Sequence, residues 1–158
     1  MEIERKFVLP GKPDLLLPKP AEIRQGYVLL NHVAEMRVRD EGGKCTLTTK
    51  CLTANAAVRK EWETEIPRWV YEILWAETGL RRIAKRRYRI PCEELVCEVD
   101  EYRGEHEGLW VLECEFPSQA AALAFTLPEW AAGAKEVTGD ERYRNGSLAV
   151  RGVPRISN

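Results

Sequence analysis

The chain has 158 residues, of which 44% are hydrophobic and 31% are charged. This length suits one domain, residues 1–158, with a core of its own. Lys and Arg number 24 against 25 Asp and Glu, so no net field draws the chain to nucleic acid or to an anionic membrane. No apolar run approaches the roughly eighteen residues that a membrane span requires, and we expect a soluble, cytoplasmic protein.

The first half of the chain is expected to form β-strands. Residues 1–7 alternate in character, and because successive side chains of a strand point to opposite faces, Glu2, Glu4 and Lys6 share one face. Prolines interrupt residues 10–20, which are expected to form a loop. Further strands, two of them joined by a hairpin turn at Asp40–Gly43, are expected at residues 23–30, 35–39, 44–52 and 59–66.

The second half mixes helices with strands. Pro67 suits the first turn of a helix, and the spacing of Trp69, Ile73 and Leu74 predicts an apolar stripe on that helix. Ser118 can cap a second helix. Strands are expected at residues 83–90, 95–102 and 109–116, and helices at residues 67–78, 119–126 and within 140–148.

The cysteines and histidines give no sign of a site. Five cysteines, an odd number without a C-x-x-C pair, argue against a disulfide framework and a zinc knuckle. Each cysteine lies on the apolar phase of its segment, so we expect reduced core residues. His32 and His106 stand alone and are expected in loops or at the surface.

Charge segregates strongly on the expected strands. On six of them one phase carries two or three charged residues, of both signs, while the other phase is mostly apolar. One architecture is a sheet whose charged face is wetted by solvent. The other, which we expect, is a mainly β fold, an eight-stranded antiparallel closed barrel with a charged interior and a few helices packed outside. Such an interior persists only if acids and bases pair with one another, with metal or with a ligand.

The charged phase suits a metal-complexed oligophosphate. Guanidinium groups grip phosphate oxygens bidentately, and carboxylates suit Mg²⁺ or Mn²⁺, which also bind phosphate. A nucleotide site of the P-loop kind is excluded, because the chain has no G-x-x-x-x-G-K-[ST] segment. The bases on this phase are Arg37, Arg39, Lys50, Arg59, Lys85, Arg87 and Arg89. The acids are Glu2, Glu4, Glu61, Glu63, Glu98, Asp100, Glu113 and Glu115.

An ordered set of motifs resembles the CYTH superfamily, the triphosphate tunnel metalloenzymes. Glu2-Ile3-Glu4-Arg5-Lys6 matches the E-x-E-x-K signature of that family, and similar segments follow over nearly the whole chain. They include Arg37-Val38-Arg39, Arg59-Lys60-Glu61-Trp62-Glu63, Lys85-Arg86-Arg87-Tyr88, Glu98-Val99-Asp100, Glu113-Cys114-Glu115 and Arg142-Tyr143-Arg144-Asn145. The resemblance implies an eight-stranded tunnel, dependence on a divalent metal and substrates that carry a triphosphate.

The resemblance also implies roles for individual residues. The metal ligands are Glu2, Glu4 and Glu115. The residues that could hold a second ion or the attacking water, and so act in catalysis, are Glu61, Glu63, Asp100 and Glu113, with Lys85 counted beside them. The phosphate-binding residues are Lys6, Arg37, Arg39, Lys50, Arg59, Lys85 and Arg87.

The expected activity is metal-dependent hydrolysis of inorganic triphosphate (tripolyphosphate) to pyrophosphate and phosphate. An interior that is nearly all charge favours this substrate over a nucleoside or thiamine triphosphate. Thiamine triphosphatase, nucleoside triphosphatase, class IV adenylyl cyclase and a non-catalytic polyphosphate-binding module stay open as alternatives. We expect a small oligophosphate as the partner, no nucleic acid or membrane, and a monomer or homodimer.

Overall fold

The computed structural model describes residues 2–52 and 59–155. Within these ranges nine strands form one antiparallel sheet, in the order β5-β4-β3-β2-β6-β7-β8-β1-β9. The strands are β1 (Ile3–Leu9), β2 (Ala21–Leu30), β3 (Ala34–Glu41), β4 (Lys44–Leu52), β5 (Arg59–Glu65), β6 (Arg82–Cys92), β7 (Leu95–Tyr102), β8 (Trp110–Phe116) and β9 (Lys135–Glu136). The helices are α1 (Arg68–Ala76), α2 (Gln119–Ala124) and α3 (Asn145–Arg151), with 3₁₀ turns η1 (Gly104–His106), η2 (Glu129–Ala131) and η3 (Glu141–Tyr143).

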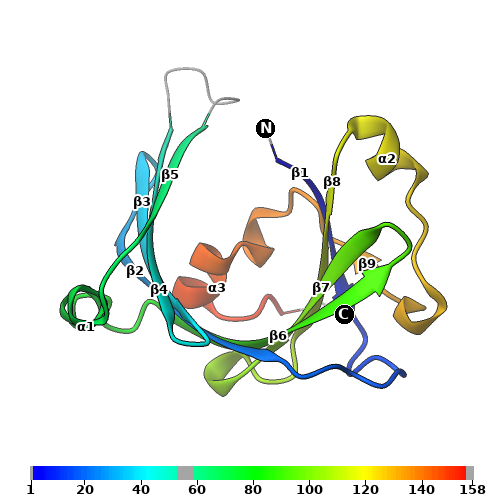
Figure 1. Ribbon diagram of the computed structural model, residues 1–158, viewed down its shortest axis with the longest axis horizontal. Helices are drawn as coiled ribbons and strands as arrows, with labels where there is room; N and C mark the ends of the chain where they lie inside the picture. Colours follow the sequence, from blue (N-terminus) through cyan, green and yellow to red (C-terminus); the bar gives the residue numbers. More distant parts are fainter. Residues whose placement is uncertain (1, 53–58, 156–158) are drawn as a thin grey trace.

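The sheet is strongly curved but open, so the prediction of a closed eight-stranded barrel is wrong. Among the described residues, β5 and β9 are the two ends of the sheet, and β9 pairs only with Phe7 and Val8 of β1. Strands β4 and β5 form one wall of the curve and β1 and β8 the opposite wall (Figure 1). Closure would bring the acidic phase of β5, with Glu61 and Glu63, beside Glu4 of β1, and like charges placed side by side destabilise strand pairing.

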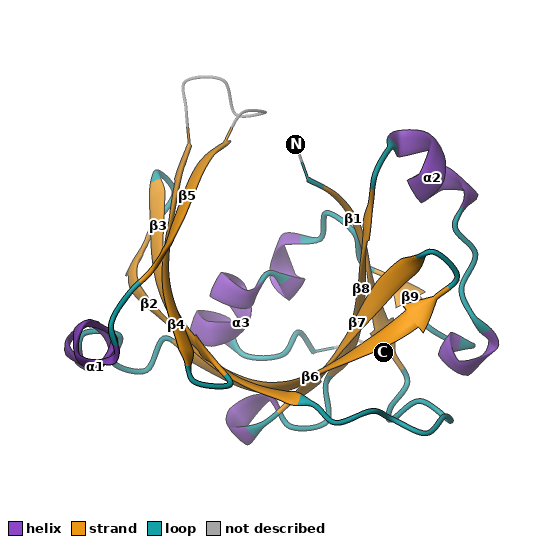
Figure 2. Cartoon of the chain, in the orientation of Figure 1, coloured by secondary structure: helices purple, strands orange, loops and turns teal. Residues whose placement is uncertain are grey.

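All eight expected strands are present, and their alternation is confirmed. The charged phase faces the concave side of the sheet, and the apolar phase packs on the convex side under α1 and α2 (Figure 2). Strand β9 was not expected, since two residues carry no periodic signal. The pairing of β2 with β6 brings together strands that are separated by three others along the chain.

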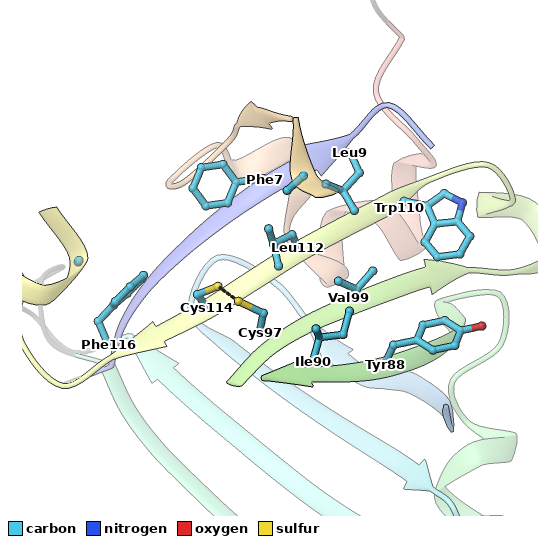
Figure 3. Close-up of a cluster of buried hydrophobic side chains, with 12 residues drawn as sticks. Phe7, Leu9, Tyr88, Ile90, Cys97, Val99, Trp110, Leu112, Cys114 and Phe116 are labelled. Carbon is cyan, nitrogen blue, oxygen red and sulfur yellow. Dashed lines mark hydrogen bonds between the residues drawn. The ribbon is translucent and has the colours of Figure 1, made fainter. Parts of the chain in front are cut away.

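The largest apolar cluster lies on the convex side of β6, β7, β8 and β1 (Figure 3). Val99 and Leu112 are fully buried there beside Phe7. Helix α2 covers the cluster, and Ser118 caps this helix as expected by accepting a hydrogen bond from the Ala121 amide. Burial of this apolar surface supplies the main driving force for folding this part of the sheet.

Arg5 joins three elements on the same side. Its guanidinium forms a bidentate pair with Glu136 of β9, with both nitrogen–oxygen distances 2.8 Å, and donates to the Ala122 carbonyl oxygen of α2 at 2.9 Å. The two neighbours of Arg5 in the first strand, Glu4 and Lys6, face the concave side instead. Strand β1 therefore carries a residue that holds the fold together, Arg5, between two residues that line the cavity on the concave side, Glu4 and Lys6.

Helix α1 packs on the convex side of β3 and β4 with a different face from the expected one. Tyr71 is its buried residue and stacks on Trp75 at a ring-centroid distance of 5.5 Å. Trp69 and Ile73 are exposed, so the expected stripe is only partly buried. Tyr71 packs with Val38 and with Cys45, and these contacts set the rotation of the helix.

The C-terminal segment enters the concave side of the sheet. Tyr143 and Leu148 pack there with Ile83, Tyr102 and other residues in a second apolar cluster. Helix α3 lies between the two walls of the curve (Figure 2). The segment thereby covers one end of the concave face with apolar side chains.

Two smaller expectations need correction. His106 is buried rather than exposed, and its Nε2 lies 2.6 Å from the Leu148 carbonyl oxygen. All five cysteines are free thiols, as expected, but Cys51 is exposed and Cys92 half-buried, so the assignment to the core fails for these two. In the described ranges, α1, α2 and α3 all fall short of the length and apolar character of a membrane-spanning helix.

Candidate functional site

The concave face holds a cavity of about 580 Å³ with a strongly charged lining. Its cations come from strands β1, β3, β4 and β6 and from the C-terminal segment, and its acids come mainly from β1, β5 and β8. The lining residues are Glu2, Glu4, Lys6, Tyr27, Glu35, Arg37, Arg39, Lys50, Glu61, Glu63, Arg87, Glu98, Glu113, Glu115, Arg144, Asn145 and Gly146.

Arg37, Arg39 and Lys50 form a cationic wall. Arg39 donates from Nε and Nη2 to Gln25 Oε1 at 3.1 and 2.9 Å, which fixes the plane of its guanidinium. Burial, together with the neighbouring charges of Arg37 and Arg87, lowers the pKa of Arg39 to about 10. Within the described part of the chain, Arg37 Nε is buried without a hydrogen-bond partner. Crowded cations and an unsatisfied donor both favour the binding of an anion here.

Four carboxylates line the opposite wall on the paired strands β1 and β8. Glu4 lies opposite Glu115 in the register, and Lys6 lies opposite Glu113. A hydrogen bond shared with Glu2, burial and the nearby acids raise the pKa of Glu115 to about 7. Burial and the Glu113 charge raise the pKa of Glu4 as well. Carboxylates that resist ionisation in this way gain from a cation placed among them.

The donor set of this wall fits a hard divalent cation. Mg²⁺ takes oxygen ligands, binds through one or two carboxylates, and fills its remaining positions with water and substrate phosphates. The side chains as described do not form a complete cage, because no cluster of three or more acidic, His or Cys groups in the described ranges has metal-binding geometry. A Mg²⁺ site completed by water and substrate phosphates needs fewer protein carboxylates than a full cage.

The acids of β5 stand at the edge of the cavity. Glu63 accepts a hydrogen bond from Thr48 Oγ1 at 2.8 Å and lies 4.0 Å from Arg37 Nη2. Glu61 is opposite Lys50 in the register. Both carboxylates reach solvent as well as the cavity, so water has access to them.

Beneath the cavity floor lies a buried group of charges around Arg87. Asp100 accepts two hydrogen bonds from Arg87, from Nε at 2.8 Å and from Nη2 at 2.9 Å. Lys85 Nζ forms an ion pair with Asp100 Oδ2 at 2.8 Å. Arg87 reaches the cavity, but Lys85 and Asp100 do not line it.

The structure brings together most of the expected site residues. Eleven of them line the cavity: Glu2, Glu4, Lys6, Arg37, Arg39, Lys50, Glu61, Glu63, Arg87, Glu113 and Glu115. Lys85 and Asp100 lie below the floor. The side chain of Arg59 lies outside the described part of the structure.

Several lining residues were not among the expected set. Tyr27 and Glu35 share the phase of their neighbours Gln25 and Arg37, so strand alternation could have found both. Arg144 lies in a segment with no periodic pattern; the family-like motif Arg142-Tyr143-Arg144-Asn145 marked this segment but assigned Arg144 no role.

A second cavity of about 610 Å³ adjoins the first, between the β2–β3 turn and α3. Its lining is more apolar and includes Leu30, Val33 and Val150. We call it the side cavity. Four residues line both cavities: Glu35, Lys50, Arg144 and Gly146.

Comparison with known proteins gives two close matches over nearly the whole chain. The chain is 40% identical to an inorganic triphosphatase of Acetivibrio thermocellus over 148 residues, which are 93% of this chain and 92% of the relative. It is 38% identical to an inorganic triphosphatase of Nitrosomonas europaea over 152 residues, which are 94% and 97% of the two chains. No protein-family model matches the chain.

Solved structures show the same fold. The crystal structure of the inorganic triphosphatase NE1496 has a TM-score of 0.72 to this chain and 36% sequence identity, and the match covers 94% of each chain. A putative adenylyl cyclase of Hippeastrum with a dominant triphosphatase activity has a TM-score of 0.53 and only 18% identity, over 78% of this chain and 83% of the other. The second likeness concerns the fold alone.

Proposed function

The chain belongs to the inorganic triphosphatases of the CYTH superfamily, and we propose that it hydrolyses inorganic triphosphate to pyrophosphate and phosphate with Mg²⁺ or Mn²⁺. The observation that carries the proposal is the division of the cavity into a cationic wall and a carboxylate wall. Such a division matches a substrate that is itself a string of anions bound to a cation.

The cationic wall would hold the phosphates. Arg37 offers a buried donor that lacks a partner in the described residues, and Arg39 is held in a fixed plane by Gln25. Lys50 and Lys6 add ammonium groups from either side of the cavity. A guanidinium that is positioned before substrate arrives loses little freedom on binding, which favours both affinity and transition-state stabilisation.

The carboxylate wall would hold the metal ion. We assign this role to Glu2, Glu4 and Glu115. A hydrogen bond shared with Glu2, burial and the nearby acids raise the pKa of Glu115. A bound ion supplies neutralisation of phosphate oxygens and activation of water. Glu113 pairs with Lys6 at 2.9 Å, and this contact would keep the lysine aimed at the cavity.

The attacking water would be oriented by carboxylates that reach solvent. We assign this role to Glu63, whose position is fixed by Thr48, and to its neighbour Glu61. Phosphoryl transfer needs little covalent chemistry from the protein, so orientation of the water and electrostatic stabilisation suffice. Lys85 and Asp100 would act indirectly, by holding Arg87 in place beneath the phosphates.

A second candidate substrate class is an organic triphosphate, such as a nucleoside triphosphate. The side cavity favours it, because apolar residues next to the phosphate site could contact an organic group. Analysis of the products formed from ATP separates the possibilities. Phosphate release indicates hydrolysis, whereas cyclic AMP with pyrophosphate would indicate the cyclase reaction.

Replacement of Glu4 tests the assignment of the metal ligands. We expect Glu4→Gln to lower Mg²⁺- or Mn²⁺-dependent phosphate release from tripolyphosphate by about 100-fold or more, because one anionic ligand is lost. The measurement is a colorimetric phosphate assay, with the melting temperature as a check on folding.

Glu65→Gln is the matched control. Glu65 occupies the same phase of β5 as Glu61 and Glu63 but does not line the cavity. Its replacement should leave turnover within about twofold of the unaltered protein, as is usual for an exposed charge outside a site. Near-normal turnover of the folded Glu4→Gln variant would refute the metal assignment.

A further inference from the structure

We propose that Arg144 selects inorganic over organic triphosphates, by binding the far terminal phosphate at the junction between the main cavity and the side cavity. The inference rests on the proposed triphosphate site but adds a residue and a selection mechanism. Its basis is the position of one arginine, its anchored neighbours and its weak ion pair.

The backbone around Arg144 is firmly anchored to the concave face. Tyr143 is buried, and its carbonyl oxygen lies 3.4 Å from Lys6 Nζ. On the other side, Asn145 Oδ1 accepts a hydrogen bond of 2.6 Å from the Tyr102 hydroxyl group. Because both neighbours are fixed, the start of the Arg144 side chain is fixed as well.

Close packing at Gly146 holds the same segment against the cationic wall. A Cβ atom at this position would lie 3.1 Å from Leu30 Cδ1 and 3.2 Å from Glu35 Oε1. The absence of a side chain therefore lets α3 approach β2 and β3 closely. Arg144 precedes α3 by one residue, so this contact places it at the junction of the two cavities.

Arg144 lines both cavities, as do Glu35, Lys50 and Gly146, so its side chain lies at the boundary between them. On the near side are the phosphate-binding cations and the carboxylate wall. On the far side are the apolar residues Leu30, Val33 and Val150, which can contact an organic group, together with Arg142 and Arg151. A cationic side chain at this boundary can bind the terminal phosphate of a substrate that lies in the main cavity.

The guanidinium is available to a substrate. Its described ion pair is with Glu141, from Nη1 to Oε2 at 2.9 Å, and the two side chains are 35% and 71% exposed. Ion pairs this open to solvent contribute little, because water screens them and two flexible side chains must be held in place. A phosphate group with two negative charges can displace the single carboxylate of Glu141.

The chemistry of the substrate end gives the selectivity. Inorganic triphosphate carries a terminal phosphate at each end, with oxygens that match the fork of a guanidinium. In an organic triphosphate one end is esterified, so that end carries less charge and a bulky group. Arg144 should therefore favour the first substrate through a bidentate contact and disfavour the second through loss of that contact and through crowding.

Replacement of Arg144 by Gln tests the inference. With Mg²⁺ present, KM for tripolyphosphate and the inhibition constant of ATP against tripolyphosphate hydrolysis are measured for the unaltered and altered proteins. We expect KM for tripolyphosphate to rise about tenfold or more, as for loss of a charge-assisted hydrogen bond. The inhibition constant of ATP should stay the same or fall.

Three further variants serve as controls. Arg142→Gln removes the same charge from the preceding turn, where Asp140 holds the guanidinium, and should leave KM for tripolyphosphate unchanged. Glu141→Gln releases Arg144 and should lower that KM. Arg144→Lys keeps the charge without the fork and should give an intermediate KM, which keeps the test valid even if Arg144→Gln folds poorly.

An equal rise in both constants, or no change in KM for tripolyphosphate, would overturn the role of Arg144. Calorimetric titration of each protein with tripolyphosphate is run beside the kinetics. If the unaltered protein binds tripolyphosphate through Arg144 but releases no phosphate, the proposed hydrolysis fails while this inference stands. If it hydrolyses tripolyphosphate equally well without Arg144, the proposed hydrolysis stands and the role of Arg144 fails.

Discussion

At the scale of single residues, the buried charges under the cavity floor bear directly on stability. Lys85 and Asp100 have almost no exposed side-chain area, and together with Arg87 they form a compact ionic group. Burial alone would raise the pKa of Asp100, but the Lys85 and Arg87 charges outweigh it and hold that pKa well below its usual range. Burial lowers the pKa of Lys85 to about 8, although Asp100 opposes this.

Asp100 should make the stability of the protein depend on pH in the acid range. Its pKa is lower in the folded than in the unfolded chain, so its contribution is fully present above the unfolded pKa, near 3.9, and is lost as the pH falls through the lower folded value. We expect Asp100→Asn to lower the free energy of unfolding by about 3–5 kcal/mol at pH 7, because it leaves buried cations unpaired. Urea unfolding from pH 7 down to pH 3 measures this difference.

Glu94→Gln, an exposed change in the turn between β6 and β7, is the control and should have little effect at any pH. A stability difference between Asp100→Asn and the unaltered protein that stays constant down to pH 3 would contradict the assigned pKa.

Strand alternation predicts which face such residues occupy but not how deep they lie. Lys85 and Arg87 share one phase of β6, yet only Arg87 lines the cavity. The difference arises from the C-terminal segment, whose apolar residues pack over that end of the concave face next to Ile83 and Tyr102. No pattern within β6 encodes that cover, and the burial of His106 by the same segment was missed for the same reason.

At the scale of elements, the positions of the strands are determined by the local sequence pattern, whereas the rotation of helix α1 is determined by the sheet on which it packs. Strands β1 to β8 could be predicted because alternation is a property of neighbouring residues, whereas the two-residue strand β9 could not. The rotation of α1 could not, since it depends on the surface presented by β3 and β4. Its C-terminal end is set by Thr78, which is fully buried and whose hydroxyl group donates to the Trp75 carbonyl oxygen at 2.7 Å.

Gly26 of β2 allows this close approach of helix and sheet. A Cβ atom at Gly26 would lie 2.8 Å from Thr78 Cγ2 and 2.9 Å from Thr78 Cβ. We expect Gly26→Ala to destabilise the protein by about 1–3 kcal/mol, because Thr78 is held by its hydrogen bonds and cannot move aside cheaply. Urea unfolding measures the change.

Gly11→Ala provides the matched control. A Cβ atom at Gly11 would meet no heavy atom within 4 Å. That change should be neutral or slightly stabilising, because alanine restricts the unfolded chain more than glycine does. Equal effects of the two substitutions would contradict the packing argument.

At the scale of the whole molecule, the open sheet separates two walls of opposite chemical character. Closure of a sheet depends on whether its two end strands pair, and those strands lie far apart in sequence, so alternation within each strand carries no information about it. Here Glu4 of β1 and Glu61 and Glu63 of β5 all line the cavity, and their like charges disfavour pairing of β1 with β5. The same separation leaves room for a substrate that joins the walls.

The most direct test of this account is phosphate release from tripolyphosphate, measured with Mg²⁺ and with Mn²⁺ and compared with pyrophosphate, ATP and thiamine triphosphate. We expect rapid release from tripolyphosphate, loss of release when the metal is chelated, and turnover of the organic triphosphates that is slower by about tenfold or more, as for one missing charge-assisted contact. Binding of tripolyphosphate without phosphate release under any metal condition would contradict the proposed function.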